Sequence, residues 1–178
     1  AKRPTWIASG LNGLPVIRGD GVSASLTLGS DILLTTTAGF ALYFVGNRSS
    51  GTYWQPLSNT SSRATIAEIY SNNHAYLSDD AGNVATKAYT GATGGTAVCW
   101  RCAAGGAVTF SATGQSASTA AGSLSGNATF SALLTQAYYS LCSYGDLAWW
   151  LIVPSAVSGT THGQVAAWIS DRFGVALP

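Results

Sequence analysis

The feature that most constrains the fold of this chain is a two-residue alternation of apolar and polar side chains. In "VSASLTL", residues 22–28, every second residue is apolar, so one face of an extended strand would be apolar and the other polar. In "GFALYFVG", residues 39–46, both faces would be apolar, which is typical of a strand buried on both sides. The alternation therefore predicts strands rather than helices over most of the chain.

Further strand-like stretches follow, separated by glycine-rich turn signals. They are residues 64–70, 74–78, 97–103, 107–113, 128–134 and 147–153. Many short strands at this spacing predict an all-β fold, an antiparallel β-sandwich. We expect residues 1–178 to form one such domain, because this length suits a single full-sized core. Two segments rich in small polar residues, 47–63 and 111–127, are expected to be long loops.

One short helix is expected at the C-terminal end of the chain, within "TTHGQVAAWISDRFG". Its apolar residues recur at helical spacing: Val165, Trp168, Ile169 and Phe173. Thr161 and Gln164 fit a capping box that would begin the helix, and Gly174 is placed to end it. Because so short a helix is marginally stable alone, we expect its apolar face to pack on the sandwich.

Low charge limits the possible partners. Charged residues make up 8% of the chain, the net charge is +1, and neither sign forms a run. Nucleic acid and anionic membrane surfaces are therefore not expected to be partners, since both require a basic stripe or cluster. Membrane insertion is not expected either, because the longest apolar run, "LAWWLIVP", is far shorter than the roughly 20 residues that span a bilayer.

The three cysteines, Cys99, Cys102 and Cys142, cannot all pair within one chain. Cys99 and Cys102 have redox-motif spacing, but in an extended strand residues three apart point to opposite faces. They would then neither bond to each other nor share a metal ion. Two alternatives remain: all three are small apolar strand residues, or Cys142 forms one disulfide with either of the others.

Two long stretches resemble a known family. "RPTWIASGLNGLPVIRGDGVSASLTL" and "YGDLAWWLIVPSAVSGTTHGQVAAWISDRFGV" resemble the opening and closing segments of concanavalin A-like (laminin G-like) jelly-roll domains of bacterial surface proteins and phage virion proteins. The resemblance covers nearly the whole chain in order and rests on packing and turn residues. It implies a jelly-roll sandwich with a terminal helix, located on a virion or an extracellular cell surface.

The chain departs from the family pattern at two positions. Gly19 stands where the family usually has an aromatic residue, and Trp149 stands where its closing strand usually has a glutamate. The ligand and metal geometry of relatives is therefore not carried over to this chain.

The tripeptide Arg18-Gly19-Asp20 is a sequence that many integrins recognise. In the family pattern, Arg18 ends a strand and Asp20 with Gly21 makes the following turn. We interpret the tripeptide as that turn, because a three-residue motif has low specificity.

Segment 47–63 contains the best candidates for a carbohydrate site. Sugars stack on exposed aromatic rings, while amide and guanidinium groups hydrogen-bond their hydroxyls. The candidate residues are Tyr53, Trp54, Gln55, Asn59 and Arg63. The alternative is that Trp54 folds back and plugs the rim of the sandwich, because tryptophan is usually well buried.

The stretch "LSDDAGN" contains candidate oxygen ligands for Ca²⁺, namely Asp79, Asp80 and Asn83. Calcium takes six to eight oxygens, so this segment could supply only part of a site. A hairpin turn explains the same residues equally well. No other cofactor is expected.

The sequence contains no recognisable catalytic constellation. Glu68 is the only glutamate, so the pattern Glu-x-Asp-x-x-Glu, which glucanases of this fold have along one strand, is absent. An enzyme would require folding to bring Glu68 beside Asp79, Asp80 or Asp146 in a cleft.

We therefore expect a non-catalytic binding or structural module of a phage virion or cell-surface assembly. Its expected partner is a glycan or a host receptor. Two alternatives remain: a purely structural decoration or subunit-interaction domain, and a polysaccharide-degrading enzyme of the same fold.

Overall fold

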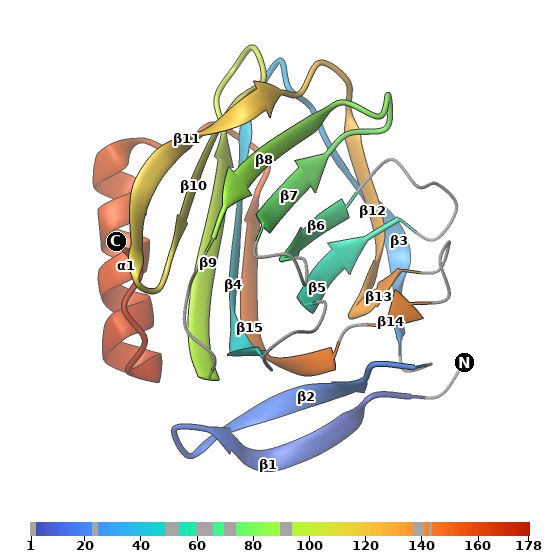
Figure 1. Ribbon diagram of the computed structural model, residues 1–178, viewed down its shortest axis with the longest axis vertical. Coiled ribbons are helices and arrows are strands. Elements are labelled where there is room, and N and C mark those ends of the chain that lie inside the picture. Colours follow the sequence, from blue (N-terminus) through green and yellow to red (C-terminus); the bar gives the residue numbers. More distant parts are fainter. Residues whose placement is uncertain are drawn as a thin grey trace.

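The computed structural model describes residues 3–22, 25–48, 54–59, 66–69, 74–89, 94–136, 141–142 and 144–178. Within these ranges the chain forms a 13-stranded antiparallel sheet, a second sheet of two short strands, and one helix near the C-terminal end (Figure 1). The predicted antiparallel all-β fold with one short C-terminal helix is confirmed.

The large sheet has the strand order β1-β2-β15-β4-β9-β10-β11-β8-β7-β6-β5-β12-β3. Its strands are β1 (Thr5–Leu11), β2 (Leu14–Asp20), β3 (Leu26–Leu34), β4 (Phe40–Arg48), β5 (Trp54–Ser58), β6 (Ile66–Ile69), β7 (His74–Ser78), β8 (Val84–Ala88), β9 (Gly94–Cys102), β10 (Ala107–Ala112), β11 (Gln115–Ser123), β12 (Ala128–Leu133) and β15 (Tyr144–Val153). The two-stranded sheet pairs β13 (Thr135–Gln136) with β14 (Leu141–Cys142).

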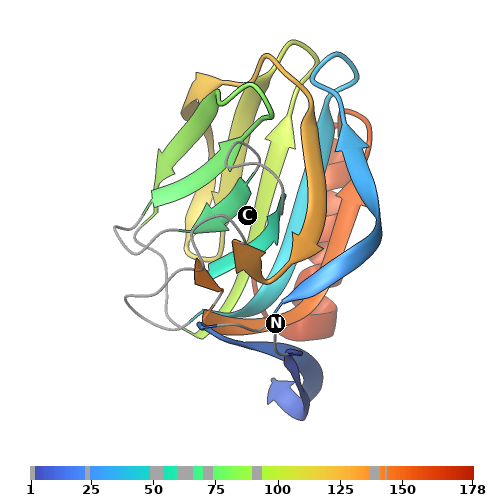
Figure 2. The same cartoon turned by 90° about the vertical axis from the view of Figure 1, so that its right-hand side faces the viewer.

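The large sheet curls so that its two halves face each other, as the two perpendicular views show (Figures 1 and 2). One half runs from β1 to β11 and the other from β8 to β3, and Ala121 of β11 pairs with Thr86 of β8 where they meet. The inner faces enclose the main core, because alternation turns every second side chain inward. Its largest members are Trp54, Trp100, Tyr89, Phe40, Phe44, Phe110 and Phe130.

Strand β4 is buried on both of its faces. Phe40, Leu42 and Phe44 point into the main core. Tyr43 and Val45 point to the opposite face, where they belong to a second core beneath the helix. The prediction of a doubly buried strand is therefore confirmed. We call the helix side of this half of the sheet the outer face. The core on this face is the outer core, and the main core between the two halves is the inner core.

Strand β9 shows the same division. Cys99 lies in the outer core and Cys102 in the inner core, as predicted for residues three apart in a strand. Both are free thiols, so neither forms the disulfide with Cys142 that we left open. Burial raises the pKa of Cys99 to about 12 and that of Cys102 to about 11, so both thiols stay protonated and unreactive at neutral pH.

The helix α1 (Gly159–Phe173) covers the outer face of the sheet (Figure 1). Ser158 is its N-cap, and the Ser158 hydroxyl accepts a hydrogen bond from the Thr161 backbone N–H. The predicted capping box beginning at Thr161 is therefore wrong, because the helix already begins at Gly159 and Ser158 is its N-cap. Gly174 ends it as predicted, with a left-handed φ of 64°.

The buried side of α1 is rotated from the predicted one. Ile169 and Phe173 are buried as expected, but His162 and Ala166 complete that side, while Trp168 is 45% exposed. In the ranges that the structure describes, no helix is long and apolar enough to cross a membrane.

Both predicted long loops contain strands. Strand β5 lies within segment 47–63. It was not predicted because Pro56 interrupts the strand pattern. The proline is tolerated at an irregularity, where the register with β6 shifts between Trp54 and Leu57. Strand β11 lies within segment 111–127, where pairing with β10 orders a stretch of small residues.

We predict that Ser158→Ala lowers the free energy of unfolding by about 1 kcal/mol, because the Thr161 N–H loses its acceptor. The melting temperature should fall by about 2–4 °C in circular dichroism. Thr160→Ala, an exposed hydroxyl one residue inside the helix, is the matched control and should change little. Equal effects of the two variants would contradict the cap assignment.

Candidate functional site

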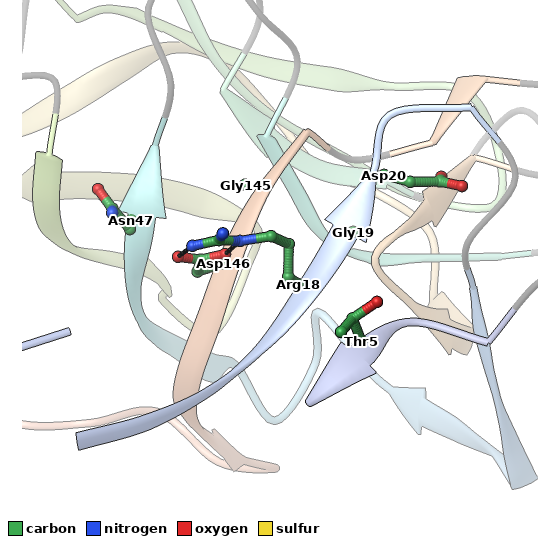
Figure 3. Close-up of a pocket in the computed structure, with 7 residues that line it drawn as sticks. All are labelled: Thr5, Arg18, Gly19, Asp20, Asn47, Gly145 and Asp146. Atoms are coloured by element: carbon green, nitrogen blue, oxygen red, sulfur yellow. Dashed lines mark hydrogen bonds and ion pairs between the residues drawn. The ribbon is translucent and has the colours of Figure 1, made fainter. Parts of the chain in front are cut away.

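A row of polar side chains crosses four neighbouring strands of the sheet. Thr5 of β1 pairs with Arg18 of β2, Arg18 pairs with Asp146 of β15, and Asp146 pairs with Asn47 of β4. The row lies on the outer face, since residues two positions away along these strands belong to the outer core. With Gly19, Asp20 and Gly145, these residues line a pocket of about 470 Å³ (Figure 3).

A bidentate ion pair fixes one wall of this pocket. The Arg18 Nε lies 2.6 Å from Asp146 Oδ1, and the Arg18 Nη2 lies 2.8 Å from Oδ2. The Asp146 side chain is only 3% exposed, whereas that of Arg18 is 49% exposed. The carboxylate therefore holds the guanidinium in one orientation at the pocket, in the planar geometry that arginine favours (Figure 3).

Trp54 supports the pocket from the inner side of the sheet. It comes from β5 in the opposite half, and its Nε1 donates a hydrogen bond of 3.2 Å to the Asp146 backbone carbonyl. Two glycines permit this approach: a Cβ at Gly46 would lie 2.8 Å from the indole, and one at Gly145 would lie 3.0 Å from it. The core packing of Trp54 and the position of Asp146 are thus linked.

The predicted carbohydrate residues are not presented to solvent where the structure describes them. Trp54 has no exposed surface, and Gln55 and Asn59 are also buried. Tyr53 and Arg63 lie outside the described residues. The burial of Trp54 is the arrangement expected under the alternative in which it plugs the sandwich.

The Arg-Gly-Asp tripeptide forms the end of β2 and contributes all three residues to the pocket. Asp20 is exposed, and its Oδ1 accepts a hydrogen bond of 2.9 Å from the Val22 N–H in the bend that follows. The strand runs two residues beyond Arg18, where the sequence pattern had ended it. Local patterns in the sequence do not indicate the pocket, because the ion-pair partner of Arg18 is 128 residues away.

Asp79, a candidate calcium ligand, serves as an anchor between two loops. Its carboxylate is buried and accepts six hydrogen bonds from five donor groups. The donors are the backbone N–H groups of Ala81, Asn83, Ser125 and Gly126 and the side-chain amide of Asn83, which reaches both oxygens. Burial opposes ionisation of Asp79, but the hydrogen bonds from Gly126, Ser125 and Asn83 outweigh it and lower the pKa.

Asp80 is exposed, but its carboxylate also accepts hydrogen bonds. Its two oxygens accept hydrogen bonds from the Thr129 backbone N–H and hydroxyl, at 3.1 and 2.6 Å. A calcium ion would have to displace these donors, so the geometry favours the hairpin-turn interpretation of this segment. Among the residues that the structure describes, no three His, Cys, Asp or Glu side chains are grouped to hold a metal ion.

Glu68 is a carboxyl group buried in the described part of the sheet. It lies opposite Tyr76 on the side of β6 that faces away from the main core, and it is 3% exposed. Among the residues that the structure describes, none donates a hydrogen bond to its Oε2. Burial raises the pKa of this carboxyl to about 7, so much of it is protonated at neutral pH.

His162 forms a second buried polar contact, between α1 and the sheet. Its Nδ1 lies 3.2 Å from the Tyr43 hydroxyl, and its Nε2 lies 3.0 Å from the Pro178 carbonyl oxygen. Burial lowers the pKa of His162, so the neutral ring is favoured. These contacts tie the helix to β4 and to the C-terminal segment, which is a structural role.

Comparison with known proteins gives no family for this chain. No protein-family model matches it, and no curated protein matches it with statistical significance. The chemistry of the pocket must therefore be argued from its own residues.

We predict that Trp54→Ala lowers the free energy of unfolding by about 3–5 kcal/mol, because it empties a fully buried site and leaves the Asp146 carbonyl without its donor. Thermal denaturation should show a drop of roughly 10 °C. Trp6→Ala, which removes a tryptophan that is 65% exposed, should change the melting temperature far less. A near-normal melting temperature for Trp54→Ala would contradict the placement.

Glu68 should make stability depend on pH. Its pKa is raised from 4.5 to about 7 in the folded state, so the folded protein binds the proton more tightly than the unfolded chain. The contribution of Glu68 to stability is then greatest below pH 4.5 and falls as the pH rises toward 7 and above, by on the order of 3 kcal/mol. Urea denaturation of the protein and of Glu68→Gln at pH 5 and 8 tests this. The variant should lose less stability over that interval, and parallel behaviour would refute the assignment.

Proposed function

We propose that this chain is a non-catalytic recognition module that binds a glycan at the polar row on its outer face. The observation that carries the proposal is the row itself: four polar side chains on neighbouring strands line one pocket of about 470 Å³. That volume lies within the range of about 300–1,000 Å³ that is typical of small-ligand sites.

The chemistry of the row suits a sugar. Sugar hydroxyls both donate and accept hydrogen bonds, and the pocket combines the Asn47 amide, the Arg18 guanidinium, the Thr5 hydroxyl and the Asp20 carboxylate. These groups project from strands rather than from flexible loops, and the ion pair with Asp146 orients Arg18 in advance. Such preorganisation reduces the entropy lost when a ligand binds.

The hydrogen bonds of the carboxylates favour binding over catalysis. Asp146 receives Arg18 on both oxygens, and Asp79 is saturated by N–H donors. Asp80 is held by Thr129. An enzyme would need Asp79, Asp80 or Asp146 beside Glu68. Each of these three carboxylates is instead hydrogen-bonded to other groups.

We also propose that the fold is a concanavalin A-like jelly-roll sandwich and that the module belongs to a phage virion or a cell-surface assembly. The curled sheet with two facing halves supports the first proposal. The two stretches that carry the family resemblance also lie side by side, because β2 pairs with β15. The location rests on the resemblance alone. The exposure of Trp168 and Trp150 favours a subunit-interaction role as a second function.

A glycan array tests the proposal, with Asn47→Ala and Arg18→Lys as the informative variants. Asn47→Ala removes the amide, and Arg18→Lys keeps the charge but removes the planar bidentate geometry. Each should reduce the glycan signal by roughly tenfold or more, since one lost hydrogen bond to a charged or amide group costs about 1–3 kcal/mol.

The matched control is Asn127→Ala, an exposed asparagine outside the pocket, which should bind like the original protein. The melting temperature of each variant is measured in parallel, so that unfolding is not mistaken for lost recognition. Binding that survives both pocket variants, or no binding to any glycan, would overturn the proposal.

A further inference from the structure

The second half of β15 has one strand neighbour among the described residues. Strand β4 pairs with β15 as far as Val153, whereas β2 pairs only with its first part, from Tyr144 to Leu147. The register with β4 shifts after Leu147 and is regular from Trp149 onward. Residues 149–153 therefore form a sheet edge on the side away from β4, where outward N–H and C=O groups can accept a further strand.

This edge lacks the features that usually prevent strand addition. Natural edge strands are protected by charged side chains, prolines or strong twist. Residues 147–153, "LAWWLIV", contain no charged residue and no proline before Pro154. Trp150 is 39% exposed, although it lies on the same side of the strand as Ile152, which packs against the inner core.

The outer face beside this edge is also apolar and hollowed. Two shallow depressions of about 340 and 320 Å³ lie between β15 and α1 and share Trp149 and Trp168, and the second is also lined by Arg172. Leu151 and Val165 line the first of them. We call the edge of residues 149–153, together with Trp168, the β15 strip.

We propose that the β15 strip binds a second copy of this chain, through antiparallel pairing of the two β15 edges about a two-fold axis. Paired residues lie on the same face of the joined sheet, and the register centred on Leu151 pairs all five residues of the edge. Leu151 then faces Leu151 of the second copy. Trp149 faces Val153 of the second copy, and Trp150 faces its Ile152. Every pair in this register is apolar, so one strand supplies both halves of a self-complementary interface.

The charge of the β15 strip and the surface area that it can bury indicate how a second copy of the chain would bind there. Residues 147–158 contain no charged side chain, so pairing of the two β15 edges brings no like charges of these segments together. The exposed parts of Trp150 and Trp168 and five edge residues together bury on the order of 400 Å² per copy, below the roughly 800 Å² of a standard interface. We therefore expect a reversible dimer that forms as protein concentration rises.

Sedimentation equilibrium across a wide range of concentrations measures this association. Leu151→Lys and Leu151→Glu should each be monomeric, because the axis places two like charges opposite each other. An equal mixture of the two should regain the dimer, since lysine then faces glutamate. Trp6→Lys, which introduces the same charge at an exposed tryptophan outside the strip, should dimerise like the original protein.

Two further measurements keep the test decisive if the Leu151 variants fold poorly. Trp168→Lys alters only the helix side of the strip and should weaken the dimer by roughly tenfold. Hydrogen exchange of the amides in residues 149–153 should slow as concentration rises, which contact through side chains alone would not cause. A protein that stays monomeric at every concentration would overturn the proposal and leave the edge to a different partner. A dimer indifferent to the Lys and Glu substitutions would also overturn it.

Discussion

The burial of β4 on both faces is the constraint on which the rest of this structure depends. Its inward side chains need the opposite half of the sheet to cover them, and its outward side chains need α1. Each fully buried apolar side chain contributes roughly 1.5–3 kcal/mol, so neither cover can be removed without exposing several such contributions. The curl of the sheet and the docking of the helix are therefore two consequences of the same strand.

The polar row lies where the apolar outer core gives way to polar side chains. Along β4, the outward residue Val45 packs in the outer core, and the next outward residue, Asn47, lines the pocket. Asp146 joins the two environments: its side chain holds Arg18 at the pocket and its carbonyl accepts the Trp54 indole from the inner core. The rigidity of the pocket thus derives from the packing beneath it.

The two proposals concern successive parts of one strand. Asp146 lies in the pocket, and Leu151 lies five residues along β15 at the centre of the inferred two-fold axis. At 3.3 Å per residue, two copies joined there would present their pockets on the same face, roughly 33 Å apart along the strand direction. A dimer would then offer two ligand sites at a fixed spacing, which raises the avidity for a repetitive glycan surface. Either proposal can nevertheless fail without the other.

Local patterns in the sequence determined the strand periodicity, the doubly buried β4 and the glycine that ends α1, because each depends on near neighbours along the chain. The sequence did not reveal β5, because Pro56 is not typical of a strand interior. Residues 54–58 form a strand through their burial and their pairing with β6. The site was also beyond local patterns. Trp54 lies in a segment whose composition is typical of a ligand-binding loop, yet it is fully buried in the core. Arg18 forms its ion pair with Asp146, which is 128 residues away in the sequence. Periodicity is set by adjacent residues, whereas partners are set by the route of the whole chain, so only the tertiary structure decided which polar groups meet.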